Sequence, residues 1–419
     1  MAYTEYTETS SRGWLDRIGG SFRGIIAGFV VIGLGTWLLW WNEGRTFRRA
    51  GVIGEAQVLA QDVQDISRVD PALEGRLIHA TGRADTTDVL RDPVFGVSAT
   101  AISIGRRAEY YQWTEESRTT KRKEGTREIT ETTYEYRKKW TGSPVDSSTF
   151  KNPEYNGSAT AGAGGADVGP NDTLARFDNA SIYAPKVAFG AYQLSEAQKR
   201  GIGGAIPLNV SLASEDAASI VREVRISELY RKRYIWGAVS ADELIHASGN
   251  TVYIGLDPGA PRIGDVRVTF TQTPPADISI IARVVRDTFE PYSSPNGNGT
   301  FSRLNMGTLS MEKMFEDAKS ENSFMAWLLR VVGALVVVMG FRMILSPLAV
   351  LVDVIPILGA VVDAGVGIVS FLLGAAWSLL VIAAAWLRFR PVVAGCLIAA
   401  AVILALLPSF LRRRRAASR

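Results

Sequence analysis

Two aspartates in an apolar stretch are the residues of this chain whose type and setting could do chemistry. Asp353 and Asp363 lie in a segment that also carries Pro347 and Pro356. A carboxylate at the centre of a bilayer costs about 2.5–3.5 kcal/mol on insertion scales, and carboxylates kept there are often functional. The functional interpretation is therefore a path for ions or protons. The alternative, which we favour, places both aspartates at the lipid headgroup level or at helix caps.

No other residues have the spacing of a catalytic or metal-binding motif. The chain has one cysteine, Cys396, and two histidines, His79 and His246. This excludes an internal disulfide and a cysteine-based zinc site. The Gly-x-Gly-Gly run at 201–204 lacks the preceding strand and the acidic partner of a dinucleotide fingerprint. The sequence predicts a protein that is not an enzyme, with no catalytic residues, no metal and no cofactor.

The aspartates belong to a chain with four apolar stretches. One lies near the N-terminus and three lie in the C-terminal quarter, with roughly 280 polar residues between them. The first stretch has about 18 apolar residues and ends in Trp40 and Trp41, which suit an interfacial aromatic belt. No small-residue cleavage site follows it, so we predict an uncleaved signal anchor.

The predicted fold class is an α-helical membrane region joined to a large, strand-dominated α+β extramembrane domain. The membrane region has four transmembrane helices plus a re-entrant or interfacial segment, because prolines interrupt helices. The predicted parts are a cytoplasmic N-terminal tail at 1–23, transmembrane helices at 24–41, 324–345, 364–387 and 391–411, an extracytoplasmic or lumenal domain at 42–323, the re-entrant or interfacial segment at 346–363, and a basic cytoplasmic tail at 412–419.

Positive charge at the C-terminus sets the predicted orientation. Arg412, Arg413, Arg414 and Arg415 follow the last apolar stretch directly. Such a run could bind nucleic acid, but in this position it indicates a basic, membrane-proximal segment on the cytoplasmic side. Four crossings then place both termini in the cytoplasm and the large domain on the opposite side.

A charged hairpin is the clearest local prediction within the large domain. Thr, Tyr and Ile alternate with charged residues over 129–136, and Gly125 lies near the expected turn. The basic cluster at 121–123 is interpreted as a solvated hairpin tip rather than a ligand site. Residues 155–170, rich in Gly, Ala and Ser, are predicted to form a loop.

Several blocks along the whole chain resemble the LUMA family, also called the transmembrane protein 43 family. The most specific block is Glu-Tyr-Tyr-Gln-Trp-Thr-Glu-Glu-Ser at 109–117. Others are Trp-Asn-Glu-Gly-Arg at 41–45, Gly-Asp-Val-Arg-Val at 264–268 and Arg-Pro at 390–391. The Gly/Ala-rich loop at 155–170 and the four consecutive arginines depart from the animal pattern.

The resemblance implies a protein with four spans whose large domain faces the lumen or the exoplasmic side. Animal members are linked to the endoplasmic reticulum and the inner nuclear membrane, where they self-associate and have lamins and emerin as partners. The alanine- and arginine-rich composition favours a bacterial homologue in the inner (plasma) membrane, to which those two partners would not transfer. No catalytic residues are known for the family.

Three functions from different classes are compatible with the sequence. The first is a self-associating multi-pass scaffold that organises membrane proteins or lipids through its large domain. The second is an ion channel or transport subunit that uses Asp353 and Asp363, and a membrane-bound enzyme acting on lipid is a third. The expected partners are membrane lipids, further copies of the chain and other membrane proteins, and not nucleic acid.

Overall fold

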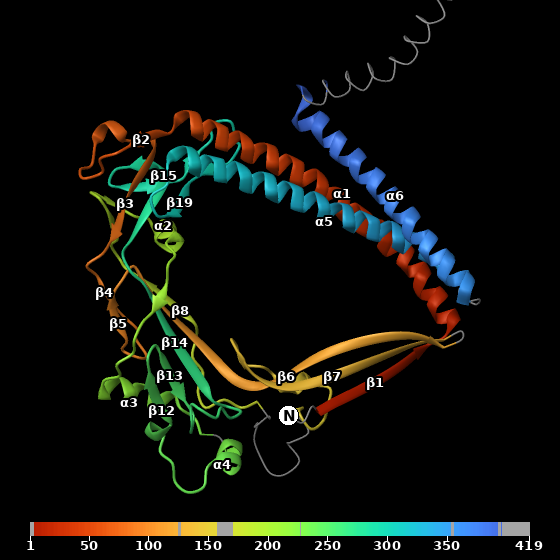
Figure 1. The fold of residues 1–419 in the computed structure, drawn as a ribbon, viewed down its shortest axis with the longest axis horizontal. Coiled ribbons are helices and arrows are strands. Elements are labelled where there is room, and N and C mark those ends of the chain that lie inside the picture. Colours follow the sequence, from red (N-terminus) through yellow and green to blue (C-terminus); the bar gives the residue numbers. More distant parts are fainter. Residues whose placement is uncertain are drawn as a thin grey trace, which may run out of the picture.

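The computed structural model describes residues 4–124, 127–156, 171–226, 228–352, 356–392 and 395. It contains three long helices, which are α1 (Trp14–Leu59), α5 (Met311–Val352) and α6 (Pro356–Phe389). Figure 1 shows α1 and α5 lying side by side, with α6 across them and the strand-rich domain where α1 ends and α5 begins. This arrangement agrees with a membrane region joined to a strand-rich domain.

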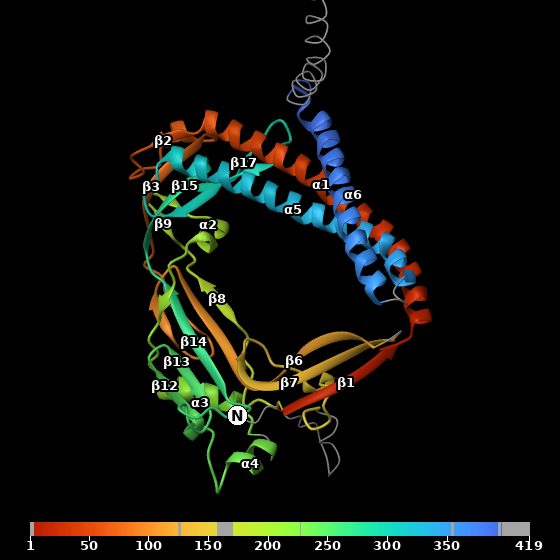
Figure 2. The same ribbon diagram turned by 45° about the vertical axis from the view of Figure 1, so that its right-hand side comes forward.

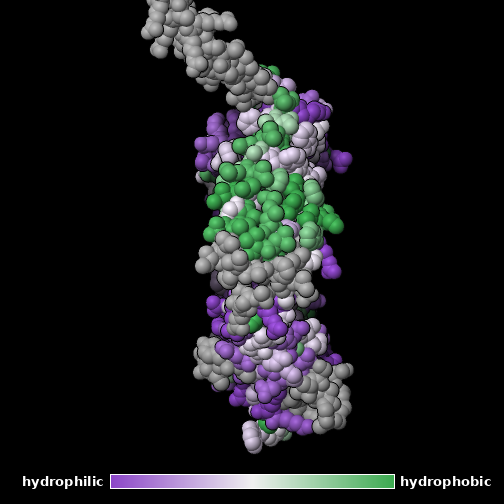
Figure 3. Space-filling view, turned by 90° about the vertical axis from the view of Figure 1, so that its right-hand side faces the viewer, coloured by the Kyte–Doolittle hydropathy of each residue, from purple (hydrophilic) through white to green (hydrophobic). Residues whose placement is uncertain are grey.

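The three long helices are apolar enough to cross a membrane. Among the described residues the candidate spans are Phe22–Leu59, Met311–Val352 and Val361–Phe389. Figure 3 shows their apolar side chains gathered in one band, with hydrophilic surface above it and further below it. The predicted fourth helix at 391–411 lies almost wholly outside the described residues. The structure therefore supports an integral membrane protein with three of the four predicted spans.

The predicted re-entrant or interfacial segment at 346–363 is helical wherever it is described. α5 continues through Pro347 to Val352, and α6 begins at Pro356. A proline inside a helix leaves the carbonyl four residues earlier without its backbone donor. Here the Ser346 hydroxyl donates a hydrogen bond to that carbonyl, Met343 O, at 2.8 Å. Pro356 stands at the first helical position, where no backbone bond is lost. Neither proline breaks its helix, and the depth of the segment in a bilayer stays a prediction.

The larger sheet is antiparallel and contains the predicted hairpin. Its order is β1 (Thr4–Arg12), β7 (Arg127–Thr141), β6 (Ser103–Glu124), β14 (Val266–Thr273), β13 (Thr251–Ile254) and β12 (Ile245–Ser248), with β8 (Ala180–Tyr183) beside β6 and β11 (Ile206–Pro207) beside β14. β6 and β7 pair from Tyr110 and Thr141 to Glu124 and Arg127. The hairpin around Gly125 is thus confirmed up to the residues that flank its turn.

The second sheet has seven strands. They are β19 (Arg303–Met306), β15 (Ala276–Val285), β16 (Thr288–Glu290), β10 (Tyr192–Gln193), β9 (Ala188–Phe189), β3 (Leu77–Asp85) and β2 (Gln61–Val63). Two small hairpins, β4 (Val89–Arg91) with β5 (Ser98–Thr100) and β17 (Tyr292–Ser293) with β18 (Thr300–Phe301), and three short helices, α2 (Glu196–Gly201), α3 (Ser214–Glu223) and α4 (Glu228–Tyr234), complete the domain. Pairing is mostly antiparallel, as expected, but β2–β3 and β10–β16 are parallel.

A separate apolar cluster joins the long helices to the second sheet. Val52, Ile53 and Ala56 of α1 and Met314, Phe315 and Ala318 of α5 pack with Leu77, Ile281 and Phe301 of the domain. All nine side chains are almost completely buried. α1 has 46 residues, about 69 Å at 1.5 Å per residue, so it is long enough to cross a bilayer and still reach this core.

Part of the predicted N-terminal tail forms a strand, β1. β1 pairs antiparallel with β7 through nine residues, from Thr4 and Tyr136 to Arg12 and Glu128. β6, β7 and β1 together make a ribbon that reaches from the domain to the N-terminal end of α1 (Figures 1 and 2). No local sequence pattern predicts this pairing, because the two strands are more than a hundred residues apart.

A buried carboxylate holds one corner of the larger sheet. Asp265 accepts hydrogen bonds from the Tyr230 hydroxyl at 2.5 Å, from the Tyr253 hydroxyl, and from the Arg262 backbone N–H at 2.7 Å. Burial raises the pKa of Asp265, although the three donors act in the opposite direction. The loop that precedes β14 is therefore fixed by a carboxylate whose ionised form depends on these donors.

Replacing Tyr253 by phenylalanine is expected to destabilise the protein by about 1–3 kcal/mol at neutral pH, because the buried carboxylate loses a donor. The pKa of Asp265 is higher in the folded protein than in the unfolded one, so ionising this group costs folding stability. The cost is absent at pH values below the unfolded-state pKa. It develops as the pH rises through the folded-state pKa. The destabilisation caused by Tyr253→Phe should therefore be smaller in mild acid than at neutral pH. Thermal unfolding of the full chain in detergent tests this, with Tyr183→Phe as the control. An equal loss at both pH values would contradict it.

Candidate functional site at the helix junction

Glycines set the close approach of α1 and α5. Gly28 faces Gly340, and Gly35 faces Gly333, so two pairs with seven-residue spacing meet in antiparallel order. A Cβ added at Gly340 would lie 2.6 Å from Ile32 Cγ1 and 2.9 Å from Gly28 O. Small residues at such crossings let helix backbones pack tightly within a membrane. The two helices therefore act as one unit.

A buried ion pair lies where the apolar parts of all three helices approach the domain. Arg330 on α5 donates from Nε to Glu43 Oε1 at 2.6 Å and from Nη2 to Glu43 Oε2 at 2.9 Å. The Glu43 side chain is 1% exposed and that of Arg330 is 13% exposed. The indole N–H of Trp386 on α6 donates to Glu43 Oε2 at 2.9 Å. One carboxylate on α1 thus binds side chains from both other helices.

Aromatic rings cover the cation of this pair. The Arg330 guanidinium carbon lies 5.0 Å from the ring centre of Trp327 and 5.8 Å from that of Trp386. Contacts of a cation with aromatic faces are attractive and gain strength when water is excluded. The bidentate geometry and the two rings offset part of the cost of burying charge.

Two asparagines extend the cluster along α1 and α5. Asn42 Nδ2 donates to Ala326 O at 3.0 Å, and Asn322 Nδ2 donates to Thr46 O at 3.1 Å. These bonds tie each helix to the backbone of the other. The Oδ1 atoms of both asparagines and the Thr46 hydroxyl are buried without a partner among the described residues. We call Asn42, Glu43, Thr46, Asn322, Arg330 and Trp386 the helix junction.

Polar contacts continue from the helix junction into the domain. Arg49 Nη1 donates to Thr300 O at 2.9 Å, and its guanidinium lies over the Phe301 ring. Glu55 accepts hydrogen bonds from Ser294, Asn296 and Asn298 in the loop between β17 and β18. The membrane helices and the domain are therefore joined by a continuous series of contacts rather than by a loose linker.

The predicted site residues do not come together at the helix junction. Asp363, near the start of α6, lies 3.3 Å from Arg342 Nη2, and both side chains are more than half exposed. The Asp363 carboxylate therefore forms an exposed ion pair with a neighbouring helix in this structure. Asp353 and the arginines at 412–415 lie outside the described residues. Sequence reasoning missed Glu43 and Arg330, although a charged residue inside the predicted span at 324–345 was the available signal.

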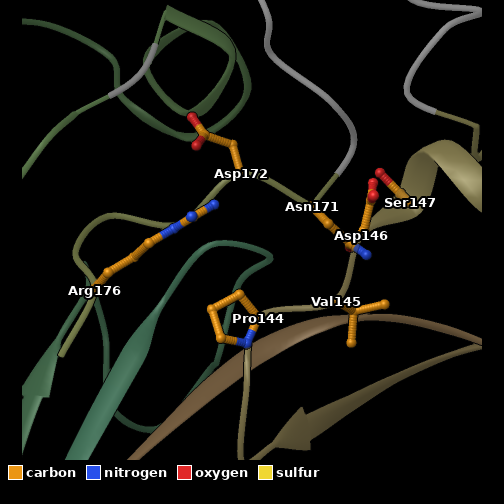
Figure 4. Close-up of a pocket in the computed structure, with 7 residues that line it drawn as sticks. All are labelled: Pro144, Val145, Asp146, Ser147, Asn171, Asp172 and Arg176. Atoms are coloured by element: carbon orange, nitrogen blue, oxygen red, sulfur yellow. The ribbon is translucent and has the colours of Figure 1, made fainter. Parts of the chain in front are cut away.

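A hollow in the domain surface is a second candidate site. It is lined by Pro144, Val145, Asp146, Ser147, Asn171, Asp172 and Arg176. Figure 4 shows Asp172 and Arg176 on one side and Asp146 and Ser147 on the other. Asp146 accepts from the Ser148 N–H, and Asn171 bonds the backbone of Trp113, so these groups hold local turns. Within the described part of the chain, no three His, Cys, Asp or Glu side chains are grouped to hold a metal ion.

Comparison with known proteins decides the family. The model of the transmembrane protein 43 family matches residues 110–391, which include most of the strand-rich domain, α5 and α6. The chain belongs to the transmembrane protein 43 family. This confirms the resemblance seen in the sequence and identifies a membrane protein with membrane-spanning helices. No solved structure gives a significant match to the chain.

Curated members of the family match the chain over nearly its whole length. Transmembrane protein 43 of Rattus norvegicus is 28% identical over 417 residues, covering 96% of this chain and 94% of the relative. The Homo sapiens protein is 28% identical over 420 residues, covering 97% and 94%. A homolog from Drosophila melanogaster is 23% identical over 385 residues, covering 89% and 90%. The matched regions of the rat and human proteins therefore span the positions of the helix junction as well as the domain.

Proposed function

We propose that this member of the transmembrane protein 43 family is a non-enzymatic, multi-pass membrane scaffold. It self-associates and organises membrane proteins or lipids through its large domain. The observation that carries the proposal is the helix junction, in which one buried carboxylate links all three described membrane helices close to the domain. Such a cluster holds a fixed geometry between membrane and domain, which a scaffold needs.

The ion-channel alternative receives less support. Asp363 is paired with Arg342 on an exposed surface. The charged cluster at the helix junction is buried, and its carboxylate oxygens are bound by Arg330 and Trp386. Under this proposal, the protein resides in the inner (plasma) membrane if its source is a bacterium. It resides in the endoplasmic reticulum and inner nuclear membrane if its source is a eukaryote. Lipids and other membrane proteins are the proposed partners.

The size of the extracted complex tests the scaffold proposal. We expect membrane extraction into polymer-bounded lipid discs to give particles containing several copies of the 45.5 kDa chain. Mass photometry at low protein concentration measures this directly. A matched sample in a harsh detergent should dissociate to single chains, which calibrates the monomer. Single chains in lipid discs at every protein-to-lipid ratio would contradict self-association.

A further inference from the structure

Two arginines from different helices lie beside one aromatic ring next to the helix junction. Phe389, the last residue of α6, packs on α1: a Cβ added at Gly44 would lie 2.9 Å from Phe389 Cζ and 3.3 Å from Arg48 Nη1. The guanidinium carbon of Arg388 lies 5.8 Å from the centre of the same ring. Two cations, one on α1 and one on α6, are therefore held in the same place.

A third arginine adds unpaired hydrogen-bond donors to this place. Arg45 precedes Arg48 by three residues, so the two side chains are neighbours on one face of α1. The Nε and Nη2 atoms of Arg45 are buried without a hydrogen-bond partner among the described residues, and such a donor costs stability. The residue as a whole is only half-buried, so a rotation of its long side chain brings these donors to the surface. We call Arg45, Arg48 and Arg388 the arginine cluster.

The surrounding chain supplies no counter-charge for the arginine cluster. None of its three members forms an ion pair within the described residues. The carboxylates of the same stretch of α1 have other partners, because Glu43 is bound in the helix junction and Glu55 by the β17–β18 loop. Residues 391–419, which follow the cluster in the sequence, contain neither Asp nor Glu. The unbalanced charge therefore points to an anionic ligand.

The arginine cluster lies at the level of lipid headgroups. The candidate span of α6 ends at Phe389, beside the cluster. The Trp40 ring, whose centre is 5.8 Å from that of Phe389, precedes the cluster on α1, and tryptophan is enriched where hydrocarbon meets the headgroups. A phospholipid in the bilayer therefore presents its phosphate at the height of these guanidinium groups. Guanidinium groups match phosphate oxygens through paired hydrogen bonds.

Arginines at the ends of membrane helices often extend to the headgroups without selecting a lipid. Two features distinguish the arginine cluster from that arrangement. Extension into water would separate like charges, whereas Arg48 and Arg388 converge on one ring. Under the predicted orientation the cluster also lies opposite the cytoplasm, where arginines beside membrane spans are usually scarce. Both features favour a ligand that holds the charges together.

We propose that the arginine cluster binds the phosphate of an anionic phospholipid in the leaflet next to the domain. The lipid offsets the repulsion between Arg48 and Arg388, and its oxygens accept the hydrogen bonds that Arg45 leaves unmade. α6 is then fastened to α1 at two neighbouring points, by the Trp386–Glu43 hydrogen bond and by the lipid. The proposal rests on the proposed scaffold function and names the class of lipid that the scaffold holds.

Thermal unfolding of the full chain, reconstituted in lipid discs, tests the site. Discs of phosphatidylcholine are compared with discs that also contain phosphatidylglycerol, a lipid of net negative charge. Wild-type protein should melt several degrees higher with phosphatidylglycerol, because a ligand that binds the folded state stabilises it. Arg48→Gln with Arg388→Gln should remove most of this shift, and a titration of the phosphatidylglycerol content should show binding weakened about tenfold or more. An unchanged shift in the double variant would overturn the proposal.

Arg23→Gln is the matched control for Arg48→Gln. Arg23 is an exposed arginine near the other end of the apolar part of α1, and it forms no ion pair within the described residues. Arg23→Gln should keep the whole shift, and a loss equal to that of Arg48→Gln would overturn the site by showing unselective attraction. In phosphatidylcholine alone, Arg48→Gln should melt at or above the wild-type temperature, since it relieves repulsion between like charges. A lower temperature would assign Arg48 to the packing of the fold and contradict the proposal.

Two further measurements separate the possible sources of the result. Inorganic phosphate added to phosphatidylcholine discs should give little stabilisation, because it lacks the acyl chains that concentrate a lipid at the site. A shift as large as that with phosphatidylglycerol would overturn the lipid assignment. Mass photometry of the same discs separates lipid binding from self-association. Multi-copy particles without a phosphatidylglycerol-dependent shift would leave the scaffold standing and the lipid site wrong, whereas single chains with a selective shift would confirm the lipid site and contradict self-association.

Discussion

Glu43→Ala is expected to destabilise the membrane region by about 3–5 kcal/mol, because it leaves the Arg330 guanidinium buried without its carboxylate. The substitution also removes the acceptor of the Trp386 indole N–H, so α6 loses this hydrogen bond to α1. The result should appear as a lower temperature at which the protein loses its monodisperse peak in size-exclusion chromatography. The domain is expected to stay folded, because its own core lies apart from the helix junction.

Two comparisons show whether the buried pair causes this loss. Asp363→Ala removes an ion pair of the same chemistry that is more than half exposed, and exposed pairs contribute about 0–1 kcal/mol. It should change the melting temperature little. The double variant Glu43→Leu with Arg330→Leu removes both charges and should recover most of the stability, since apolar replacement of a buried pair is often neutral. A double variant as unstable as the sum of the two single ones would refute the explanation.

The elements that could be predicted from the sequence are those specified by local pattern. The apolar stretches became α1, α5 and α6, because about 20 successive apolar residues are enough to predict a membrane helix. The alternation around Ile129 and Thr130 predicted β7, and Gly125 predicted the turn of its hairpin. Pro347 was expected to interrupt the helix, but α5 continues through it, because the hydroxyl of the neighbouring Ser346 replaces the donor that proline lacks.

The helix junction could not be predicted because its contacts are not local. Glu43 and Arg330 are 287 residues apart in the sequence, and Trp386 lies 343 residues after Glu43. Hydropathy marked Asp363 as unusual for the same reason that it should have marked Arg330, since both are charged residues beside or within an apolar run. What hydropathy cannot show is which charges meet. That depends on the glycine-mediated register between α1 and α5.

The second large effect is expected from a substitution that disturbs the register between α1 and α5. Gly340→Val should destabilise the α1–α5 pair by about 1–3 kcal/mol or more, as overpacking does in a tight core. The added Cβ would lie 2.9 Å from Gly28 O and 2.6 Å from Ile32 Cγ1. Backbone cannot move aside as the end of a flexible side chain can, so the helices must separate. Separation would also pull Glu43 from Arg330, and the two defects should therefore not be additive.

Gly365→Val is the matched control, because it makes the same change in a long helix with the same intrinsic helix propensities. Among the described residues, a Cβ added at Gly365 would meet no atom within 4 Å outside the backbone of its own helix, so this variant should keep or slightly raise the melting temperature. Combining Gly340→Val with Glu43→Ala should cost little more than the worse single change if the glycine contact positions the ion pair. Strict additivity, or equal losses at 340 and 365, would show that the glycines do not set the register of the helix junction.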